Sequence, residues 1–433
     1  MSDGRWRWLM PGMQVKRWLA FSSVGLLVAL IGLWVGLAGA PAQWLESLYR
    51  ALDEPIRQVA TTSRAAQAMR WGLGIALVAG GLGIWWWGLR RAWRTLVSIL
   101  QPRASGRVWD VLSRYTLMAH GKHIVVIGGG TGLSTMLRGI KRYTANIVAI
   151  VTVTDDGGSS GRLRQDLGIL PPGDIRNCLI ALADAEGAMT ALLQHRFQDT
   201  TGNLSGHSVG NLLIAAMTQI RGDFEQAIQE ISKVLAIRGR VLPSTLTHVN
   251  LRAEMEDGAC VEGETAIVEY PARIRRMHLT LPDVEPPQEA IDAIRHADIV
   301  VLGPGSLFTS VIPNLLVPKI ADALRATDAL RVYVCNVMTQ PGETDGFTAS
   351  DHVRALEAHA GGRVCDYVLV NTATPQPELM ERYRASGQDL VLPDVDRIRQ
   401  MGYKVIAGNF ISQTDYVRHD PHKLAEAILR LAK

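Results

Sequence analysis

The chain has 433 residues, a formal net charge of +4 at pH 7 and four cysteines. At roughly 150 residues per domain, this length predicts two or three structural units. The positive charge is small, and Lys and Arg are dispersed after residue 110, which argues against a nucleic-acid-binding protein. The cysteines lie far apart without CxxC spacing, so we expect reduced thiols rather than a disulfide framework.

The first quarter of the chain differs chemically from the rest, since all 11 tryptophans lie between Trp6 and Trp109. No charged residue occurs from Trp18 to Leu45 or from Trp71 to Leu89. Both stretches are long enough to cross about 30 Å of hydrocarbon as helices, and tryptophans near their ends suit the membrane interface. We therefore predict a membrane anchor over residues 1–110, with transmembrane helices at about residues 18–40 and 71–89.

The flanking cations predict the orientation of this anchor. Basic residues precede the first segment and follow the second without an intervening acid: Arg5, Arg7, Lys16 and Arg17, then Arg90, Arg91, Arg94, Arg103 and Arg107. The positive-inside rule places both ends in the cytoplasm. A competing interpretation takes residues 1–40 as a signal peptide, because Ala38-Gly39-Ala40 resembles a cleavage site. Under both interpretations we expect a cell-membrane protein, multi-pass in the first, with a cytoplasmic C-terminal domain.

From residue 120 to residue 433, short apolar runs alternate with helical patterns, as in βαβ units. The predicted strands are His123–Ile127, Asn146–Thr154, Asp298–Leu302, Arg331–Asn336, Tyr367–Asn371 and Lys404–Ala407. Between about Val241 and Pro282, alternating Thr, Val and Glu around an Asp-Gly turn predict an antiparallel insertion. The predicted fold class is therefore α/β: a Rossmann-like parallel sheet with flanking helices and a small antiparallel insertion, preceded by two transmembrane helices.

The first predicted strand leads into a glycine-rich turn and an apolar helix. The turn reads Gly128, Gly129, Gly130, Thr131, Gly132, Leu133 and Ser134. Glycines let the backbone approach a phosphate closely, and the N–H groups at a helix start attract it. The turn is not a P-loop, and Leu133 stands where a dinucleotide fingerprint needs its third glycine, which disfavours an NAD-dependent oxidoreductase.

The second predicted strand ends in TVTDDGGSSGRLR, from Thr152 to Arg164. One interpretation is that Asp155 or Asp156 holds Mg²⁺, which favours one or two carboxylates together with phosphate oxygens. Hydroxyl and guanidinium groups follow that would contact phosphate: Ser159, Ser160, Arg162 and Arg164. The rival interpretation is an acid that binds a ribose hydroxyl, as in dinucleotide-binding folds.

Two further helix starts carry polar side chains. In PPGDIRN, Asp174 is a good N-cap, and Arg176 and Asn177 would face a ligand at the helix mouth. In GHSVGN, Asn211 opens another apolar helix whose start would receive an anion.

A second glycine-rich turn follows the strand ending at Leu302. It supplies Gly303, Gly305, Ser306, Thr309 and Ser310. Two such turns would clasp a ligand across a crevice at the carboxyl ends of the strands. Because no Ser–His–Asp order, HExxH or GxSxG signature occurs, the sequence names no nucleophile.

Together these motifs resemble the YvcK-like gluconeogenesis factors, which are relatives of CofD, the 2-phospho-L-lactate transferase. The matching segments follow the family order: GGGTGLS at Gly128–Ser134, TVTDDGGSSGRLR at Thr152–Arg164, PPGDIRNCL at Pro171–Leu179, GHSVGN at Gly206–Asn211 and GPGSLFTSVIPNLL at Gly303–Leu316. The resemblance implies a Rossmann-like fold that binds a nucleotide-sugar, such as UDP-N-acetylglucosamine.

The resemblance also implies roles for individual residues. Gly128–Ser134 would form the nucleotide loop, Asn211 and Gly303–Ser310 would contact the nucleotide, and Asp155 and Asp156 would be metal or catalytic residues. Mg²⁺ is the expected metal, and no organic cofactor is expected. The two amino-terminal spans would be an addition to the soluble core that typifies the family.

The leading hypothesis is a membrane-tethered nucleotide-sugar-binding regulator of cell shape, peptidoglycan precursor supply and growth on gluconeogenic carbon sources. Its expected partners are wall-synthesis or regulatory proteins and a second copy of the chain. The alternative is a Mg²⁺-dependent phosphotransferase of the CofD type, which moves a phospholactyl group from a nucleotide diphosphate carrier.

Overall fold

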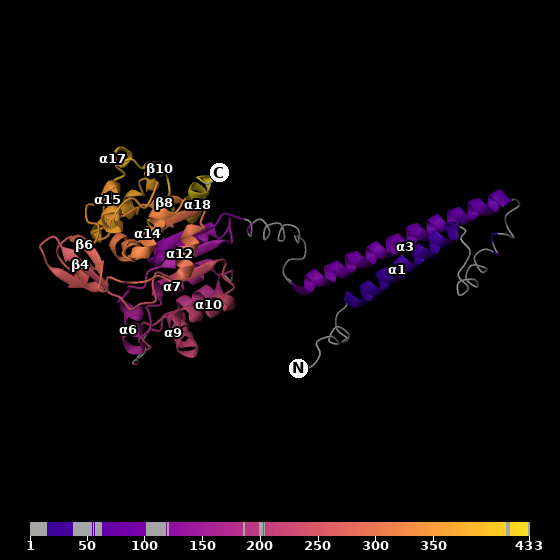
Figure 1. The fold of residues 1–433 in the computed structure, drawn as a ribbon, viewed down its shortest axis with the longest axis horizontal. Coiled ribbons are helices and arrows are strands. Elements are labelled where there is room, and N and C mark those ends of the chain that lie inside the picture. The colour runs from indigo at the N-terminus through magenta and orange to yellow at the C-terminus, as the bar shows by residue number, and fades with distance from the viewer. Residues whose placement is uncertain are drawn as a thin grey trace. The chain divides into compact units, whose positions relative to one another are not determined.

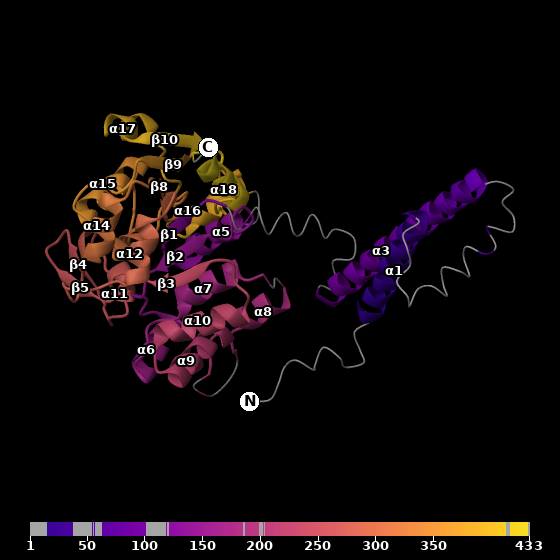
Figure 2. The ribbon, with the colours of Figure 1, turned by 45° about the vertical axis from the view of Figure 1, so that its right-hand side comes forward.

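The structure, a computed structural model, describes residues 15–37, 63–100 and 121–431, together with 54, 56 and 118, but not 185–186, 199–201, 203 or 413–415. The cleavage-like Ala38-Gly39-Ala40, the end of the first predicted span and the basic residues before residue 15 lie outside the described residues. The chain divides into two compact units, Met1–Arg114 and Tyr115–Lys433, drawn in Figures 1 and 2.

The amino-terminal unit is a pair of helices, α1 (Val15–Leu37) and α3 (Ser63–Leu100). Within them, Arg17–Val35 and Gln67–Thr95 are long and apolar enough to cross a membrane. The second helix extends beyond the predicted span at both ends, because its flanking Ala, Arg, Gln and Leu residues are good helix formers.

Glycines let the two helices touch backbone to backbone. A Cβ added at Gly25 would lie 2.5 Å from the Trp85 amide nitrogen, and one added at Gly81 would lie 2.4 Å from that of Ala29. Neither separation accommodates a side chain. Small residues at such crossings allow close packing where the surrounding lipid offers no hydrophobic drive for association.

The second unit is built on a seven-stranded sheet in the order β10-β9-β8-β7-β1-β2-β3, with every neighbouring pair parallel. Its strands are β1 (Ile124–Gly128), β2 (Ile147–Val151), β3 (Arg240–Pro243), β7 (Ile299–Leu302), β8 (Leu330–Val334), β9 (Tyr367–Asn371) and β10 (Lys404–Gly408). The six predicted strands are confirmed, with ends shifted by a few residues. The predicted α/β fold class is confirmed as well.

One boundary of the sequence interpretation is wrong. The antiparallel insertion does not begin at Val241, because Val241 to Pro243 belong to β3 and pair in parallel with β2. A four-residue edge strand that leads straight into the insertion has too little pattern to stand out. The insertion itself is a three-stranded antiparallel sheet in the order β5-β4-β6.

The insertion consists of β4 (Leu251–Met255), β5 (Cys260–Glu262), α11 (Glu264–Glu269) and β6 (Ile274–Leu279). The predicted Asp257-Gly258 turn joins β4 to β5, and Gly258 has a φ of +88° there. Few residues other than glycine adopt this conformation without strain. In Figure 1 the insertion projects at one side of the second unit.

Helices cover both faces of the parallel sheet. Strand β1 shows why: Ile124 and Val126 join one apolar cluster, whereas Val125 and Ile127 join the other. The first face carries α5 (Gly130–Ile140), α7 (Gly173–Leu182), α10 (Phe224–Val234) and α18 (Pro421–Arg430); the second carries α12 (Gln288–Arg295), α14 (Pro318–Ala326), α15 (Ala349–Ala360) and α17 (Val395–Gln400). Strands buried on both faces account for their unbroken apolar runs.

The second unit has further helices outside these two sets. They are α6 (Gly158–Leu167), α8 (Ala188–Gln194), α9 (Val209–Arg221), α13 (Ile312–Leu315), α16 (Pro377–Ala385) and the π-helical turn η3 (Leu307–Val311). Figure 2 shows α5 beside the carboxyl-terminal helix α18, where Gly139 packs on Pro421.

The strand order reverses at β1, since β2 lies on one side of it and β7 on the other. Open α/β sheets bind ligands at the carboxyl ends of the strands that flank such a reversal. Both glycine-rich turns follow these strands, one after β1 and one after β7.

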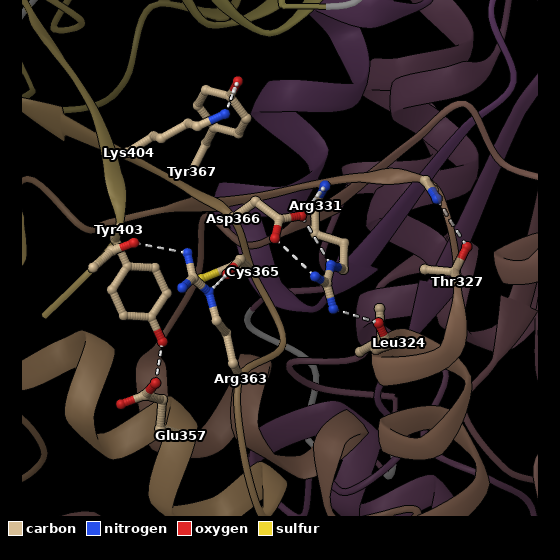
Figure 3. A network of polar contacts seen from close by, with 12 residues as sticks. Leu324, Thr327, Arg331, Glu357, Arg363, Cys365, Asp366, Tyr367, Tyr403 and Lys404 are labelled. Atoms are coloured by element: carbon tan, nitrogen blue, oxygen red, sulfur yellow. Dashed lines mark hydrogen bonds and ion pairs between the residues drawn. The ribbon is translucent and has the colours of Figure 1, made fainter.

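The opposite edge of the sheet, at the amino ends of β8, β9 and β10, is held by the polar network of Figure 3. Arg331 donates hydrogen bonds to the Asp366 carboxylate from Nε at 2.9 Å and from Nη2 at 2.7 Å. Its Nη1 donates to the Leu324 carbonyl at 3.0 Å. Burial alone would raise the pKa of Asp366, but the hydrogen bonds and charge of Arg331 outweigh it and hold that pKa below its ordinary range.

Arg331→Met should lower the free energy of unfolding of this unit by about 1–3 kcal/mol, because it leaves Asp366 partly buried without its partner. Urea unfolding followed by far-UV circular dichroism measures this. A carboxylate with a lowered pKa loses its stabilisation as pH falls, so the loss should shrink from about pH 7 to about pH 3. Arg399→Met removes an exposed ion pair with Asp396 and serves as the control, with an expected change below about 0.5 kcal/mol. Equal losses in the two variants would contradict a special role for the buried pair.

Candidate functional site

The first glycine-rich turn joins β1 to α5 without room for side chains. Gly130 has a φ of +67°. A Cβ at Gly129 would lie 2.5 Å from Asp174 Oδ2 and 2.7 Å from Thr152 Cγ2. Two members of the predicted loop serve the fold instead, since Leu133 is fully buried and Ser134 donates to the Thr131 carbonyl at 2.9 Å.

The second glycine-rich turn packs directly on the first. A Cβ at Gly132 would lie 2.7 Å from the Pro304 carbonyl oxygen, and one at Gly305 would lie 3.1 Å from that of Gly129. Asn314 ties the pair together, because its Nδ2 donates to the carbonyls of Ser310 at 2.8 Å and Gly128 at 3.4 Å. The turns therefore act as one rigid wall.

This wall borders a cavity of about 330 Å³. Predicted residues at its edge are Gly130, Thr131, Gly132, Gly305, Ser306 and Ser310. The structure thus brings together most of both predicted turns. Gly303 lies beside them with a φ of +74°, and Thr309 points elsewhere, since its hydroxyl donates to Glu343 Oε1 at 3.2 Å.

The other wall of the cavity escaped the sequence interpretation. It comes from the segment after β8, from α16 and the residues after it, and from the segment before α18: Asn336, Val337, Met338, Thr339, Gln340, Tyr383, Gln388, Val417, Arg418 and His419. Two of its amides hold the second glycine turn, because Gln340 Nε2 donates to Ser306 Oγ at 2.6 Å and Asn336 Oδ1 accepts from the Gly305 amide at 3.3 Å. In the sequence, the only indication of these segments was that predicted strands precede them.

The lining of the cavity carries one formal charge at pH 7 among the described residues. Among the described lining residues Arg418 is the cation, and none is a carboxylate. Burial lowers the pKa of His419 to about 4, so this side chain is neutral at pH 7. The arrangement suits an anionic ligand that also accepts and donates neutral hydrogen bonds.

The two adjacent aspartates after β2 have different surroundings. Asp156 is occupied by the insertion: its carboxylate accepts from the amides of Glu264 at 2.8 Å and Thr265 at 3.0 Å, and from the Thr265 hydroxyl at 2.9 Å. Among the described residues, Asp155 accepts one short-range bond, from the Gly157 amide at 3.0 Å, and it is partly exposed. Of the two, Asp155 is the one left available for a cation.

Asp174 is not the N-cap predicted for α7. The cap position belongs to Pro172, and Asp174 sits in the first turn of the helix. Its carboxylate accepts instead from the Gly130 amide of the first glycine turn, and burial raises its pKa to about 6. The side chain therefore reaches across to the first glycine-rich turn, which local sequence could not indicate.

Two glutamates that sequence reasoning missed join this acidic region. Burial raises the pKa of Glu264 to about 9, and the charges of Asp155 and Asp174 add to the effect. Burial also raises the pKa of Glu343 to about 7, although it accepts bonds from Phe308 and Thr309. Among the described residues no group of three His, Cys, Asp or Glu side chains is arranged to hold a metal ion.

The predicted phosphate contacts Arg176 and Asn177 do not face the mouth of α7. Arg176 Nη1 donates to Asn211 Oδ1 at 2.8 Å and to Ser208 Oγ, and its Nη2 donates to Asn177 Oδ1 at 2.9 Å. Asn211 is also buried, and its Nδ2 donates to Ser159 Oγ at 3.0 Å. These residues bind α7, α9 and α6 to one another and do not line the cavity.

The other candidates of the Asp-Asp loop lie on α6. Arg162 donates to the Ser205 carbonyl at 2.6 Å, and Arg164 donates to that of Val249 at 2.9 Å. Burial lowers the pKa of Arg164, while Asp156 and Asp155 oppose the shift. Ser160 is buried against Gly173, where an added Cβ would lie 2.4 Å from its Oγ. These residues fix the acidic loop in place.

Comparison with known proteins adds a family context to this geometry. The family model of 2-phospho-L-lactate transferase CofD matches residues 124–411. The gluconeogenesis factor of Bacillus subtilis is 50% identical over 317 residues, which are 73% of this chain and 100% of that protein. A crystal structure of a UPF0052 family member from Bacillus halodurans has a TM-score of 0.69 at 49% identity, covering 71% of this chain and 99% of that one.

Relatives differ in how much of this chain they cover. A putative gluconeogenesis factor of Nostoc sp. is 46% identical over 427 residues, which are 98% of this chain and 92% of that protein. That alignment extends into the amino-terminal unit, whereas the Bacillus subtilis protein aligns over its whole length with 73% of the chain.

The acidic region predicts an unusual pH dependence. The folded chain keeps a proton on Glu264 where the unfolded chain has lost it, so the stability of the wild type falls as pH rises from the ordinary glutamate pKa of about 4.3. Glu264→Gln lacks this loss. Its stability relative to the wild type should grow with pH, by up to about 1.4 kcal/mol per pH unit.

Urea midpoints from about pH 5 to about pH 8 measure this difference. The control is Glu269→Gln, at the exposed end of the same helix, which should show no such trend. An advantage of Glu264→Gln that stayed constant with pH would contradict the burial of an ionisable group.

Proposed function

Since this chain belongs to the gluconeogenesis factor family and carries its CofD-type domain, we propose that the cavity between the two glycine turns binds a nucleotide-sugar. The observation that supports this proposal most is the close packing of the two glycine turns at the strand-order reversal, with Arg418 across the cavity. A diphosphate would lie over the start of α5, where the helix dipole favours negative charge.

The remaining lining suits the nucleoside and the sugar. Asn336, Gln340 and Gln388 offer neutral amides, and Tyr383 offers a ring and a hydroxyl. The cavity volume lies within the range of small-molecule sites, about 300–1,000 Å³. A uridine diphosphate sugar such as UDP-N-acetylglucosamine is the ligand that we propose from the family resemblance.

A regulatory role fits this lining better than covalent catalysis. Ser306 accepts its hydrogen bond from an amide, and the described lining includes neither a cysteine nor a serine bonded to a histidine. We therefore propose a sensor that links nucleotide-sugar supply to cell shape, peptidoglycan precursor supply and growth on gluconeogenic carbon. Wall-synthesis or regulatory proteins, and a second copy of the chain, are its proposed partners.

The helical pair would place this sensor at the membrane. Two helices of sufficient length and apolarity, with arginines at the end of α3 that leads to the soluble unit, support a multi-pass anchor with a cytoplasmic C-terminal domain. Precursor synthesis on lipid carriers takes place at that surface, so tethering would bring the sensor near its targets.

Mg²⁺ is part of the proposal through Asp155 and Asp174. Mg²⁺ uses one or two carboxylates and completes its shell with phosphate oxygens and water, so a site without three protein ligands fits it. Bound there, it would neutralise diphosphate charge. Asp156 is removed from the proposed ligand set because the insertion occupies its carboxylate.

One observation favours a CofD-type phosphotransferase as the second candidate. Asp174 contacts the nucleotide loop and has a pKa of about 6, which suits a carboxylate that accepts a proton from an acceptor hydroxyl near neutral pH. Phosphoryl-type transfer proceeds through positioning and electrostatics and needs no covalent nucleophile.

Arg418→Ala should weaken binding of UDP-N-acetylglucosamine by about 10- to 100-fold, since one charge-assisted contact contributes about 1.5–3 kcal/mol. Calorimetric titration of the full chain in detergent measures the dissociation constant, with UDP-glucose, GDP and NAD as competitors. Arg397→Ala, outside the cavity, is the matched control. Unchanged affinity in Arg418→Ala would remove the cavity as the nucleotide-sugar site.

Asp155→Asn should abolish most of any Mg²⁺ enhancement of ligand affinity, because it removes the less occupied carboxylate. The same titrations with and without Mg²⁺ measure this effect, and assays for product measure turnover. Tight binding of a UDP-sugar without product supports the sensor. Preference for GDP that depends on Mg²⁺, or turnover at enzyme-like rates, would replace it with the transferase.

A further inference from the structure

The helical pair gathers arginines and aromatic rings at one end. A Cβ at Gly88 of α3 would lie 2.9 Å from the Trp18 carbonyl oxygen of α1, so the start of α1 lies beside the last third of α3. Arg17 is exposed at the start of α1, and Arg90, Arg91 and Arg94 are exposed on α3. Neither helix contains an aspartate or a glutamate, so no carboxylate within the pair neutralises these charges.

Two tryptophan rings hold the Arg91 guanidinium at the start of α1. The Arg91 guanidinium carbon lies 5.4 Å from the Trp18 ring centre and 5.5 Å from that of Trp87, and the two rings meet edge to face at 5.2 Å. Cation–π contacts of this kind hold a guanidinium in place. Arg91, Trp18 and Trp87 therefore hold a positive charge beside indole rings. Such rings favour the interface between hydrocarbon and headgroups.

Arg90 and Arg94 stand on a neighbouring face of α3, one helical turn apart. Trp86 and Trp93, which are 62% and 58% exposed, flank them at helical spacing. The uncharged stretch Trp71–Leu89 ends directly before Arg90. At 1.5 Å per residue it spans about 28 Å, close to the hydrocarbon thickness, so the arginines would come at the level of lipid phosphates.

We propose that this end of the helical pair, the arginine–tryptophan face formed by Trp86, Arg90, Trp93 and Arg94 together with Arg91, binds the headgroups of anionic phospholipids. The proposal rests on the membrane anchoring proposed above. Guanidinium groups pair bidentately with phosphate, and indole rings settle among the headgroups. The anchor would thus select an anionic lipid environment as well as cross the bilayer.

Tryptophan fluorescence tests this directly, because all 11 tryptophans lie between Trp6 and Trp109 and the soluble domain contributes none. The full chain is reconstituted into phosphatidylcholine nanodiscs that contain an equal fraction of either brominated phosphatidylglycerol or brominated phosphatidylcholine. Bromine quenches neighbouring indoles, so stronger quenching by the phosphatidylglycerol reports its enrichment around the anchor.

We expect enrichment in the wild type and its loss in Arg90→Gln/Arg94→Gln, by about fivefold per arginine removed, because one arginine near an anionic surface contributes about 1 kcal/mol. The variant retains Arg91 and the ring contacts that pack the helices. The matched control, Arg64→Gln/Arg70→Gln, removes the same charge near the other end of α3 and should keep the enrichment.

Three results would overturn the proposal in distinguishable ways. Equal quenching by the two lipids in the wild type means that the face does not select anionic headgroups. An equal loss of enrichment in the control means that net charge, not this face, is responsible. Absence of quenching by both lipids means that the anchor does not enter the bilayer, and the membrane placement fails with it.

Discussion

The architecture of the site depends on backbone contact between the two glycine turns. The carbonyl of Pro304 occupies the place where a side chain of residue 132 would stand, and the carbonyl of Gly129 approaches Gly305 in the same way. Because β1 and β7 are neighbours at the strand-order reversal, the turns that follow them meet without any intervening element. Their contact fixes the start of α5 relative to the second wall of the cavity.

The polar residues around this contact fall into two groups, those that join elements of the fold and those with spare hydrogen-bonding capacity. Arg176, Asn211 and Ser159 satisfy one another and join three helices. Asp156 holds the insertion through the amides of α11. Satisfied groups of this kind position a site, whereas groups with spare hydrogen-bonding capacity serve a ligand. By that criterion Asp155 and Arg418 are the side chains that we propose for ligand contact.

Sequence reasoning succeeded where signals were local. Apolar runs, most of which end in Gly, Asp or Asn, located six strands, and the glycine turns located one wall of the cavity. It failed where contacts between residues far apart in the sequence determine the role of a side chain. Asp174 looked like a cap but reaches the Gly130 amide. Arg176 looked like a phosphate ligand but pairs with Asn211, 35 positions away. The cavity's second wall has no motif, because mixed amides and rings there follow three different strands or helices.

The acidic region couples the stability of this fold to pH. Asp174, Glu264 and Glu343 all have raised pKa values because burial disfavours their charged forms. Protonation of Glu264, and in part of Glu343, near neutral pH reduces their repulsion with Asp174, at a cost in stability that grows as pH rises. A cation held at Asp155 and Asp174 would lower these pKa values and release protons. Under the proposed function, ligand binding, cation binding and pH would therefore be linked through the same few carboxyls, of which Glu264 belongs to the insertion.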